Sequence, residues 1–500
     1  MTKLLYILEF VAIAVTSFVG PLAPSAAEEP KGCRATLWRI ITDFQNPNVS
    51  RKALLARFQS AAKDFPNSEY SQEIQHSIKL LRTMVTEDME HERKAGKPAG
   101  QMTTSERVAE LIFQLRDQSG GQVMQPGRCN IFLPRNDHVP TPAEQLVEIG
   151  YDAVPQLIDA LSDERFSRAV GFHRDFYFSH YVLRIGDCSR AILERIGGRT
   201  FYDRASTSSE MVKDGAVAKV RERVKAWWAE ARVKGEKRML IEGVAAGDQN
   251  SDKQAERLVK KYPAAALDAI RTGAKNSREA WVRTNLVIAA RELPTPQTMP
   301  FFLDELNAPW RCARIASAVH LAEQKRPEAI DALIREWKKL PLDEDGFFAP
   351  AEGLDDAIRL LARSGRKDAI EALVKDLGKR AAVFRLDVVE QIGDVETATT
   401  GKPAAKEIGM LIEDALAARL SDREVVAGRF GVHQGRKYYD PRVCDVAGIF
   451  LSKRLNAEKA FDFFATKEVR DRQLFELTNT WRLRRGLKPL SRPDGAPKPP

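Results

Sequence analysis

Residues 321–334, LAEQKRPEAIDALI, recur 40 residues later as residues 361–374, LARSGRKDAIEALV. Apolar residues spaced three and four apart lie on one face of a helix. A period of about 40 residues with two helices per unit indicates stacked helix pairs, each of which buries its apolar face only against its neighbours. The register predicts that Leu333 and Leu373 are buried at equivalent places.

The same Ala/Leu/Ile pattern is found at residues 153–161 and 264–270. Helical spacing also runs through residues 35–117, and we find no strand-like alternation of apolar and polar residues. The sequence therefore predicts an all-α fold of roughly six to eight helix-pair units.

At these residues the chain resembles the HEAT-like repeat proteins, including the bacterial group named after phycobilisome-lyase repeats. The resemblance covers about 350 residues from Thr141 onward. It implies an α-solenoid used as a binding surface. It does not carry lyase activity to this chain, because no lyase motif is present.

Residues 1–27 have the features of a signal peptide. Lys3 precedes an apolar stretch that ends at Gly20, and Ser25 and Ala27 supply small residues at the cleavage site. We expect an exported chain that begins at Glu28, in the periplasm or outside the cell; a retained N-terminal anchor is the alternative. No later apolar run approaches the ~20 residues of a membrane helix, so the mature chain is predicted to have no transmembrane segment.

Four further segments are predicted. Residues 28–118 form an N-terminal helical region, and the Gly/Pro-rich residues 119–140 form a linker. The solenoid spans residues 141–481 and opens with the capping box Thr141-Pro-Ala-Glu144. Residues 482–500 form a basic, Pro-rich tail.

The five cysteines bear on the compartment. Export implies an oxidising environment, and Cys33 and Cys129 both lie in loop-like sequence beside Gly and Pro. Two interpretations stay open, a Cys33–Cys129 disulfide and two free thiols. No C-x-x-C occurs, so a zinc-finger cage is excluded.

A second repeat relates the two halves of the chain. Each copy has Leu-Ser-Asp, then a long loop with a His two residues after a Gly, then a helix with Asp in its first turn. The Asp residues are Asp187 and Asp445, each three residues after an Arg, namely Arg184 and Arg442. We predict that each Asp accepts hydrogen bonds from its own loop or helix start. That Arg is expected near the same carboxylate or bonded to the carbonyls of the loop.

The two loops supply the candidate site residues. The structural interpretation is that their aromatic residues fix each loop to the solenoid while the histidines bond locally. The functional interpretations are a groove for a peptide or glycan, an acid/base pair, or a metal site, although two His seven apart are poorly spaced for zinc. The candidate binding residues are His173, Asp175, His180, Arg184, Asp187, His433, Tyr438, Tyr439, Arg442 and Asp445.

Motif searches find no Walker, dinucleotide, G-x-S-x-G or H-E-x-x-H pattern, so no catalytic residue, cofactor or metal is predicted. The net charge is +9, and residues 481–500 carry six Lys or Arg against one Asp. Such a tail attracts anionic envelope polymer or lipid, and its alternative is a solvated tail. Nucleic acid would suit the charge but not the compartment.

Three functions remain open. The favoured one is an exported scaffold that binds a protein or peptide on its concave face without catalysis. The second is an envelope enzyme that uses the His173/Asp187 loop as acid/base or metal site. The third is a structural envelope protein.

Overall fold

The structure is a computed structural model that divides into two compact units, Met1–Ser277 and Arg278–Pro500, called here the first and second unit. The predicted signal peptide, His173 and Asp175 lie outside the described residues. The structure describes residues 32–93, 97–122, 129–133, 139–172, 180–201, 214–344, 353–395, 403–457 and 459–491.

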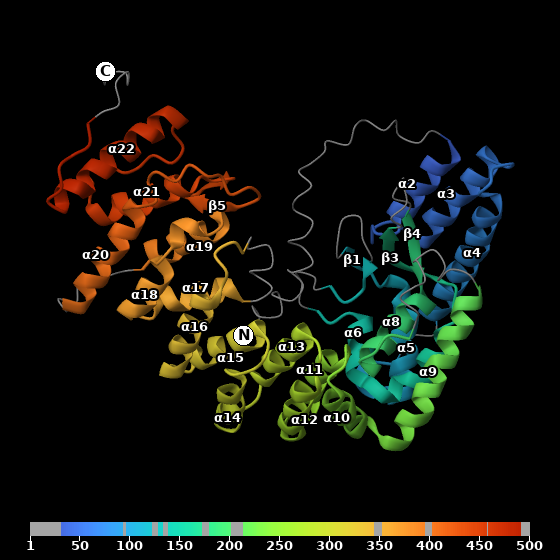
Figure 1. Ribbon diagram of the computed structural model, residues 1–500. Helices are drawn as coiled ribbons and strands as arrows, with labels where there is room; N and C mark the ends of the chain where they lie inside the picture. The colour runs from blue at the N-terminus through green and yellow to red at the C-terminus, as the bar shows by residue number, and fades with distance from the viewer. Residues whose placement is uncertain are drawn as a thin grey trace. The chain divides into compact units, whose positions relative to one another are not determined.

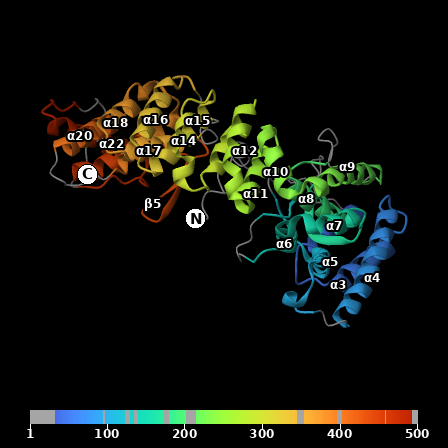
Figure 2. The same ribbon diagram turned by 90° about the horizontal axis from the view of Figure 1, so that it is seen from below.

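The first unit begins with three helices, α2 (Cys33–Asp43), α3 (Arg51–Asp64) and α4 (Ser71–Arg93). Helix α3 begins where the Ser50 hydroxyl accepts the Ala53 N–H at 3.1 Å. Helices α3 and α4 pack side by side (blue in Figure 2). The three helices share an apolar cluster, which includes Leu37 and Ile40 of α2 and Phe44 just after the end of α2.

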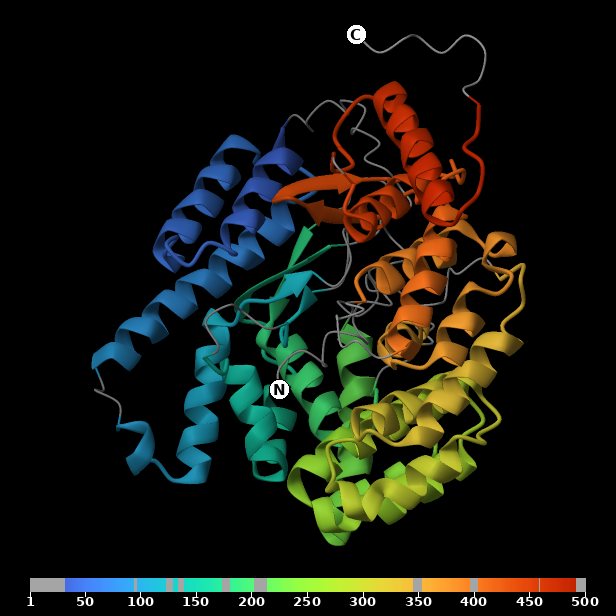
Figure 3. The ribbon, with the colours of Figure 1, turned by 90° about the vertical axis from the view of Figure 1, so that its left-hand side faces the viewer.

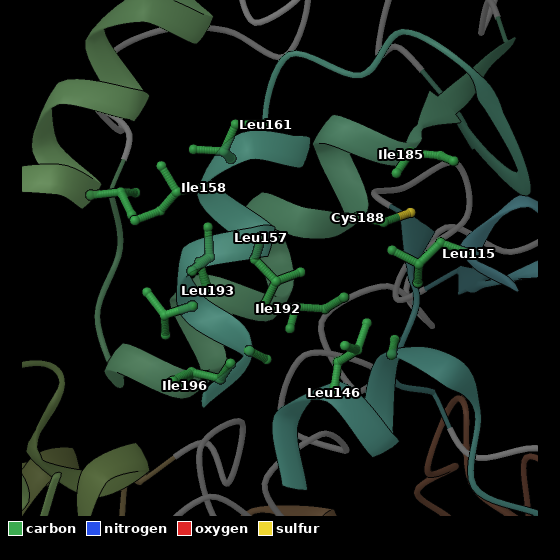
Figure 4. Packing of buried hydrophobic residues seen from close by; sticks show 14 of the residues in the cluster. Leu115, Leu146, Leu157, Ile158, Leu161, Ile185, Cys188, Ile192, Leu193 and Ile196 are labelled. Atoms are coloured by element: carbon green, nitrogen blue, oxygen red, sulfur yellow. The ribbon is translucent and has the colours of Figure 1, made fainter. Parts of the chain in front are cut away.

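A second apolar cluster holds the middle of the first unit together. Figure 4 shows Leu115, Leu146, Leu157 and Ile192 converging in it. The elements of this part are η1 (Ala99–Gln101), α5 (Thr104–Gln114), η2 (Leu115–Asp117), β1 (Gly121–Gln122), β2 (Cys129–Asn130), α6 (Pro142–Ile149), η3 (Gly150–Ala153), α7 (Val154–Ala160), β3 (Phe166–Phe172), β4 (His180–Arg184), α8 (Ile185–Gly197) and α9 (Asp214–Lys234).

The Gly/Pro-rich residues 119–140 are not the boundary between the compact units. Leu115 before this segment and Leu146 after it belong to one apolar cluster, which Ile131 from the segment itself also joins. The units divide after Ser277 instead. The predicted capping box is confirmed, since the Thr141 hydroxyl accepts the Glu144 N–H at 3.2 Å and Glu144 accepts the Thr141 N–H at 2.7 Å.

The first unit ends in three helices that pack on one another, and the first of the three contacts both of the others. They are α10 (Glu236–Ala246), α11 (Ser251–Lys261) and α12 (Pro263–Asn276).

In the second unit the helices pack in two series (Figure 1). In one series α13, α15, α17, α19 and α21 each contact the next, and in the other α16, α18 and α20 do so. The helices are α13 (Ala280–Ala290), α14 (Thr295–Glu305), α15 (Arg311–Glu323), α16 (Pro327–Lys339), α17 (Leu354–Arg363), α18 (Lys367–Val374), α19 (Ala382–Gly393), α20 (Pro403–Ala417), α21 (Val443–Leu455) and α22 (Lys467–Arg484), with η5 (Leu377–Lys379) before α19.

The 40-residue register is confirmed in α16 and α18, which pack on each other. Leu333 and Leu373 are both fully buried. Seven residues before each leucine lies an arginine, Arg326 or Arg366. Each arginine is the residue immediately before its helix begins.

The fold is predominantly helical, but the expectation of no strands is wrong. Three antiparallel two-stranded sheets occur in the described residues, β1 with β2, β3 with β4, and β5 (Phe430–His433) with β6 (Arg436–Tyr439). The last two pairs are the long loops of the sequence repeat. Strands β5 and β6 have only four residues each, and the register of β3 shifts between Phe166 and Val170, so neither hairpin gives a sustained alternation of apolar and polar residues.

Both cysteines of the predicted disulfide are free thiols. Cys33 Sγ lies 3.3 Å from the Ser68 hydroxyl, beside the α2–α4 cluster. Cys129 lies in β2 and packs against the other cluster of the unit. Burial raises the pKa of the Cys129 thiol to about 11.

The basic tail begins later than residue 482. Helix α22 extends to Arg484, and Arg485 pairs with Glu413 at 3.0 Å and with Asp414 at 2.8 Å. These carboxylates on α20 neutralise part of the charge that the sequence assigned to a free tail. Among the described residues, no helix combines the length and hydropathy needed to cross a membrane.

Candidate functional site

The sequence repeat is also a structural repeat. In each copy a helix ends shortly before Leu-Ser-Asp, at Ala160 in α7 and at Ala417 in α20, a β-hairpin follows, and the hairpin leads into a second helix. The same two backbone hydrogen bonds close each copy where that second helix begins. They are Ile185 N–H to Arg165 O at 2.8 Å and Gly186 N–H to Asp163 O at 3.0 Å in the first unit, and Val443 N–H to Glu424 O at 3.1 Å and Cys444 N–H to Asp422 O at 2.9 Å in the second.

Each hairpin has one face marked by a cross-strand Gly–Tyr pair. Gly171 stands opposite Tyr181, and Gly431 stands opposite Tyr438. A side chain at either glycine would collide with the tyrosine ring. The ring therefore lies over the glycine, and we call this the inner face of each hairpin.

The β5–β6 hairpin, drawn as orange-red arrows in Figure 3, closes through a two-residue turn. The turn residues Gln434 and Gly435 both have positive φ, 49° and 75°. Two positive φ angles are typical of the type I′ turn, whose twist matches that of paired strands.

The inner face of β5–β6 packs on an aromatic group that follows α21. The Tyr438 ring centroid lies 4.7 Å from that of Phe463. His433 stacks on Phe464 with centroids 6.2 Å apart, and the Arg436 guanidinium lies 3.9 Å from the same ring. Burial lowers the pKa of His433, against the raising effect of Asp462.

Arg429, just before β5, ties the hairpin to α19. Its guanidinium donates to Asp387 at 2.6 Å and to Glu390 at 2.7 Å. Asp387 is only 6% exposed. Burial raises the pKa of Asp387 to about 7 although Arg429 lowers it, and Asp355 and Glu390 raise it further.

The predicted hydrogen bonds to the helix-start acids are confirmed in both copies, and the predicted Arg neighbour is confirmed only at Asp445. The Arg184 N–H donates to Asp187 at 2.9 Å. Asp445 is fully buried and accepts two hydrogen bonds from the Arg442 side chain, at 2.9 and 2.7 Å. Arg470 adds a second cation to Asp445. The Arg184 side chain differs, because its guanidinium lies 3.7 Å from Glu164 rather than beside Asp187.

The outer face of β5–β6 is apolar and exposed. Phe430, Val432 and Tyr439 are 70%, 66% and 68% exposed. Phe430 pairs with Tyr439 across the strands, and Val432 pairs with Lys437. The face therefore consists of three large apolar side chains and one cation.

The structure separates the predicted residues into several groups. His433 and Tyr438 both lie on the inner face and both contact Phe463, Tyr439 lies on the outer face, and Arg442 with Asp445 forms a buried pair at the base. In the first unit, His180 lies beside Trp38 of α2, with ring centroids 5.5 Å apart. The roles of Asp387, Glu390 and Arg429 were not predicted, since Arg429 is 42 residues from Asp387 and no sequence pattern joins them.

Among the described residues, no group of three or more His, Cys, Asp or Glu side chains is arranged to hold a metal ion. Comparison of the chain with protein-family models, curated proteins and solved structures gave no match.

Proposed function

We propose that the chain is an exported helical-repeat scaffold that binds a protein partner without catalysis, and that the outer face of β5–β6 is its binding surface. The observation that carries the proposal is the exposure of Phe430, Val432 and Tyr439 together on one face. A contiguous patch of exposed apolar side chains typically marks an interaction site, whereas single exposed apolar residues are common on any surface.

The support beneath this face favours binding over a loose loop. Arg429 holds one strand to α19 through two carboxylates, and Tyr438 anchors the other strand on Phe463. A rigid base lets exposed side chains keep one arrangement, which reduces the entropy lost on binding.

The two helix series of the second unit support the solenoid part of the proposal, because stacked repeats bury each helix pair against the next. We place the binding surface on the hairpin and not on a concave helical face, since the exposed apolar residues of the candidate site gather on the hairpin.

The test compares capture of partners from an envelope extract by the full chain and by Phe430→Asp. Val233→Asp is the matched control, because Val233 is 82% exposed in α9, far along the chain from the hairpin. We expect the Phe430 variant alone to lose a specific partner. Equal capture by all three proteins would contradict the proposed surface.

Export has its own test. N-terminal sequencing of the protein recovered from the producing cell is expected to begin at Glu28. A chain that begins at Met1 or Thr2 would contradict export by cleavage.

A further inference from the structure

We infer that the outer face of β5–β6 binds an acidic, amphipathic α-helix of the partner protein. This inference rests on the proposed function and names the chemistry of the partner. It comes from a difference between the two copies of the structural repeat, in which one hairpin face is covered and its equivalent is not.

Cross-strand pairing shows which residues are equivalent. Beside the Gly171–Tyr181 pair, Val170 stands opposite Val182. Beside the Gly431–Tyr438 pair, Phe430 stands opposite Tyr439. Val170 and Phe430 therefore hold the same place on the outer face, yet Val170 is fully buried and Phe430 is 70% exposed.

Helices cover the outer face in the first unit. Val170 belongs to the apolar cluster of α2–α4, and Val182 packs against that cluster. Phe44, at the end of α2, meets Phe166 of β3 edge to face with centroids 5.3 Å apart. The hairpin fold thus takes an amphipathic helix on this face within the chain itself.

The covering helix has a simple pattern. Its large buried residues Leu37 and Ile40, together with Phe44 at its C-cap, are spaced three and four apart, the spacing of one helix face. Arg168 of β3 donates to the carbonyls of Asn46 at 3.0 Å and Val49 at 3.2 Å, just beyond the helix. A partner helix for β5–β6 needs the same apolar spacing.

The charge at the edge of the outer face determines which charge the partner helix should carry. In the first unit His180 pairs with Phe172 and meets Trp38 of the covering helix. The equivalent residue of the second hairpin is Lys437, which pairs with Val432 and is exposed. A helix that crosses this face places a side chain against a lysine, which favours Asp or Glu there.

The test uses a synthetic helical peptide of about four turns with Leu, Ile and Phe spaced three and four apart and Glu elsewhere. A peptide of the same composition in scrambled order has no single apolar face and is the first control. A peptide with Lys in place of Glu is the second. Binding to the full chain is measured by fluorescence anisotropy.

We expect the acidic helix to bind the native chain and Val233→Asp equally, and Phe430→Asp at least about tenfold more weakly. Lys437→Glu is expected to reverse the preference between the acidic and basic peptides. All three substituted side chains are exposed, so we expect the thermal melts of the variants to match that of the native chain, which would exclude misfolding.

Several results would overturn the inference. If the scrambled peptide binds as tightly as the acidic helical peptide, the face does not require a helix. If Lys437→Glu leaves the preference between the acidic and basic peptides unchanged, the charge argument is wrong. Phe430-dependent binding to anionic lipid vesicles would assign the face to a membrane, and Phe430-dependent self-association would assign it to a second copy. If Phe430→Asp loses partner capture from the extract while the helical peptide fails to bind, the proposed function stands and the helix is wrong.

Discussion

The Arg442 guanidinium donates two hydrogen bonds to the Asp445 carboxylate through one edge, from Nε to Oδ2 at 2.9 Å and from Nη2 to Oδ1 at 2.7 Å. The hydrogen bond with Asp445 raises the pKa of Arg442. The pair lies at the point where the hairpin ends and α21 begins, so it fixes the base of the candidate site.

Removing one partner of this pair is expected to be costly. Asp445→Ala removes the buried carboxylate that Arg442 and Arg470 share, and leaves Asp471, at 2.8 Å, as the remaining anion beside Arg442. Breaking a buried pair in this way typically costs about 3–5 kcal/mol of the free energy of unfolding. Asp187→Ala in the first unit loses only a helix-start hydrogen bond, about 0.5–2 kcal/mol. Denaturant unfolding of the two variants measures both values, and equal small losses would show that the buried pair is not stabilising.

The helix register predicts equivalent losses at two leucines. Leu333→Ala and Leu373→Ala each open a cavity among fully buried side chains, at a cost of about 2–5 kcal/mol. Leu483→Ala, at a residue 62% exposed, is the control and should leave the melt unchanged. An unaltered thermal melt of Leu373→Ala would contradict the packing of α18 against α16.

The Gly431–Tyr438 pair predicts a context-dependent effect. Gly431→Ala forces the Tyr438 ring away from the strand and from Phe463, so the free energy of unfolding should fall. In a Tyr438→Ala background the added methyl group meets no ring, and the same change should cost much less. A double-mutant cycle by denaturant unfolding gives the coupling, and additive effects would contradict it.

Asp387 predicts a pH dependence with a definite sign. Its pKa is raised from 3.8 to about 7 by burial, so the native state keeps the proton over an interval in which the unfolded state has lost it. The stabilisation is therefore complete below pH 4 and is lost as the pH rises through about 7. Asp387→Asn should remove this contribution from the profile of stability against pH. Superimposable slopes for the native chain and the variant would show that Asp387 does not titrate in this range.

The sequence predicted features that depend on neighbours along the chain. The equivalence of Leu333 and Leu373 follows from helix periodicity, and the contacts of Asp187 and Asp445 follow from their places in the first turn of a helix. The covering of β3–β4 by α2 joins residues more than a hundred positions apart, and no local pattern records it. The exposure of Phe430 could not be predicted either, because an aromatic residue in a loop can pack against the rest of the chain or face solvent, and the sequence does not distinguish the two.

The type I′ turn at Gln434 and Gly435 has a kinetic consequence. Both positive φ angles are already set, and the strands are in register up to the turn. For the partner binding that we propose at Phe430, we therefore expect no prior folding step in this chain. Encounter and orientation of the partner should set the association rate, on the order of 10⁵–10⁷ M⁻¹s⁻¹ for proteins that dock without rearrangement. Differences in lifetime between complexes would then arise from dissociation.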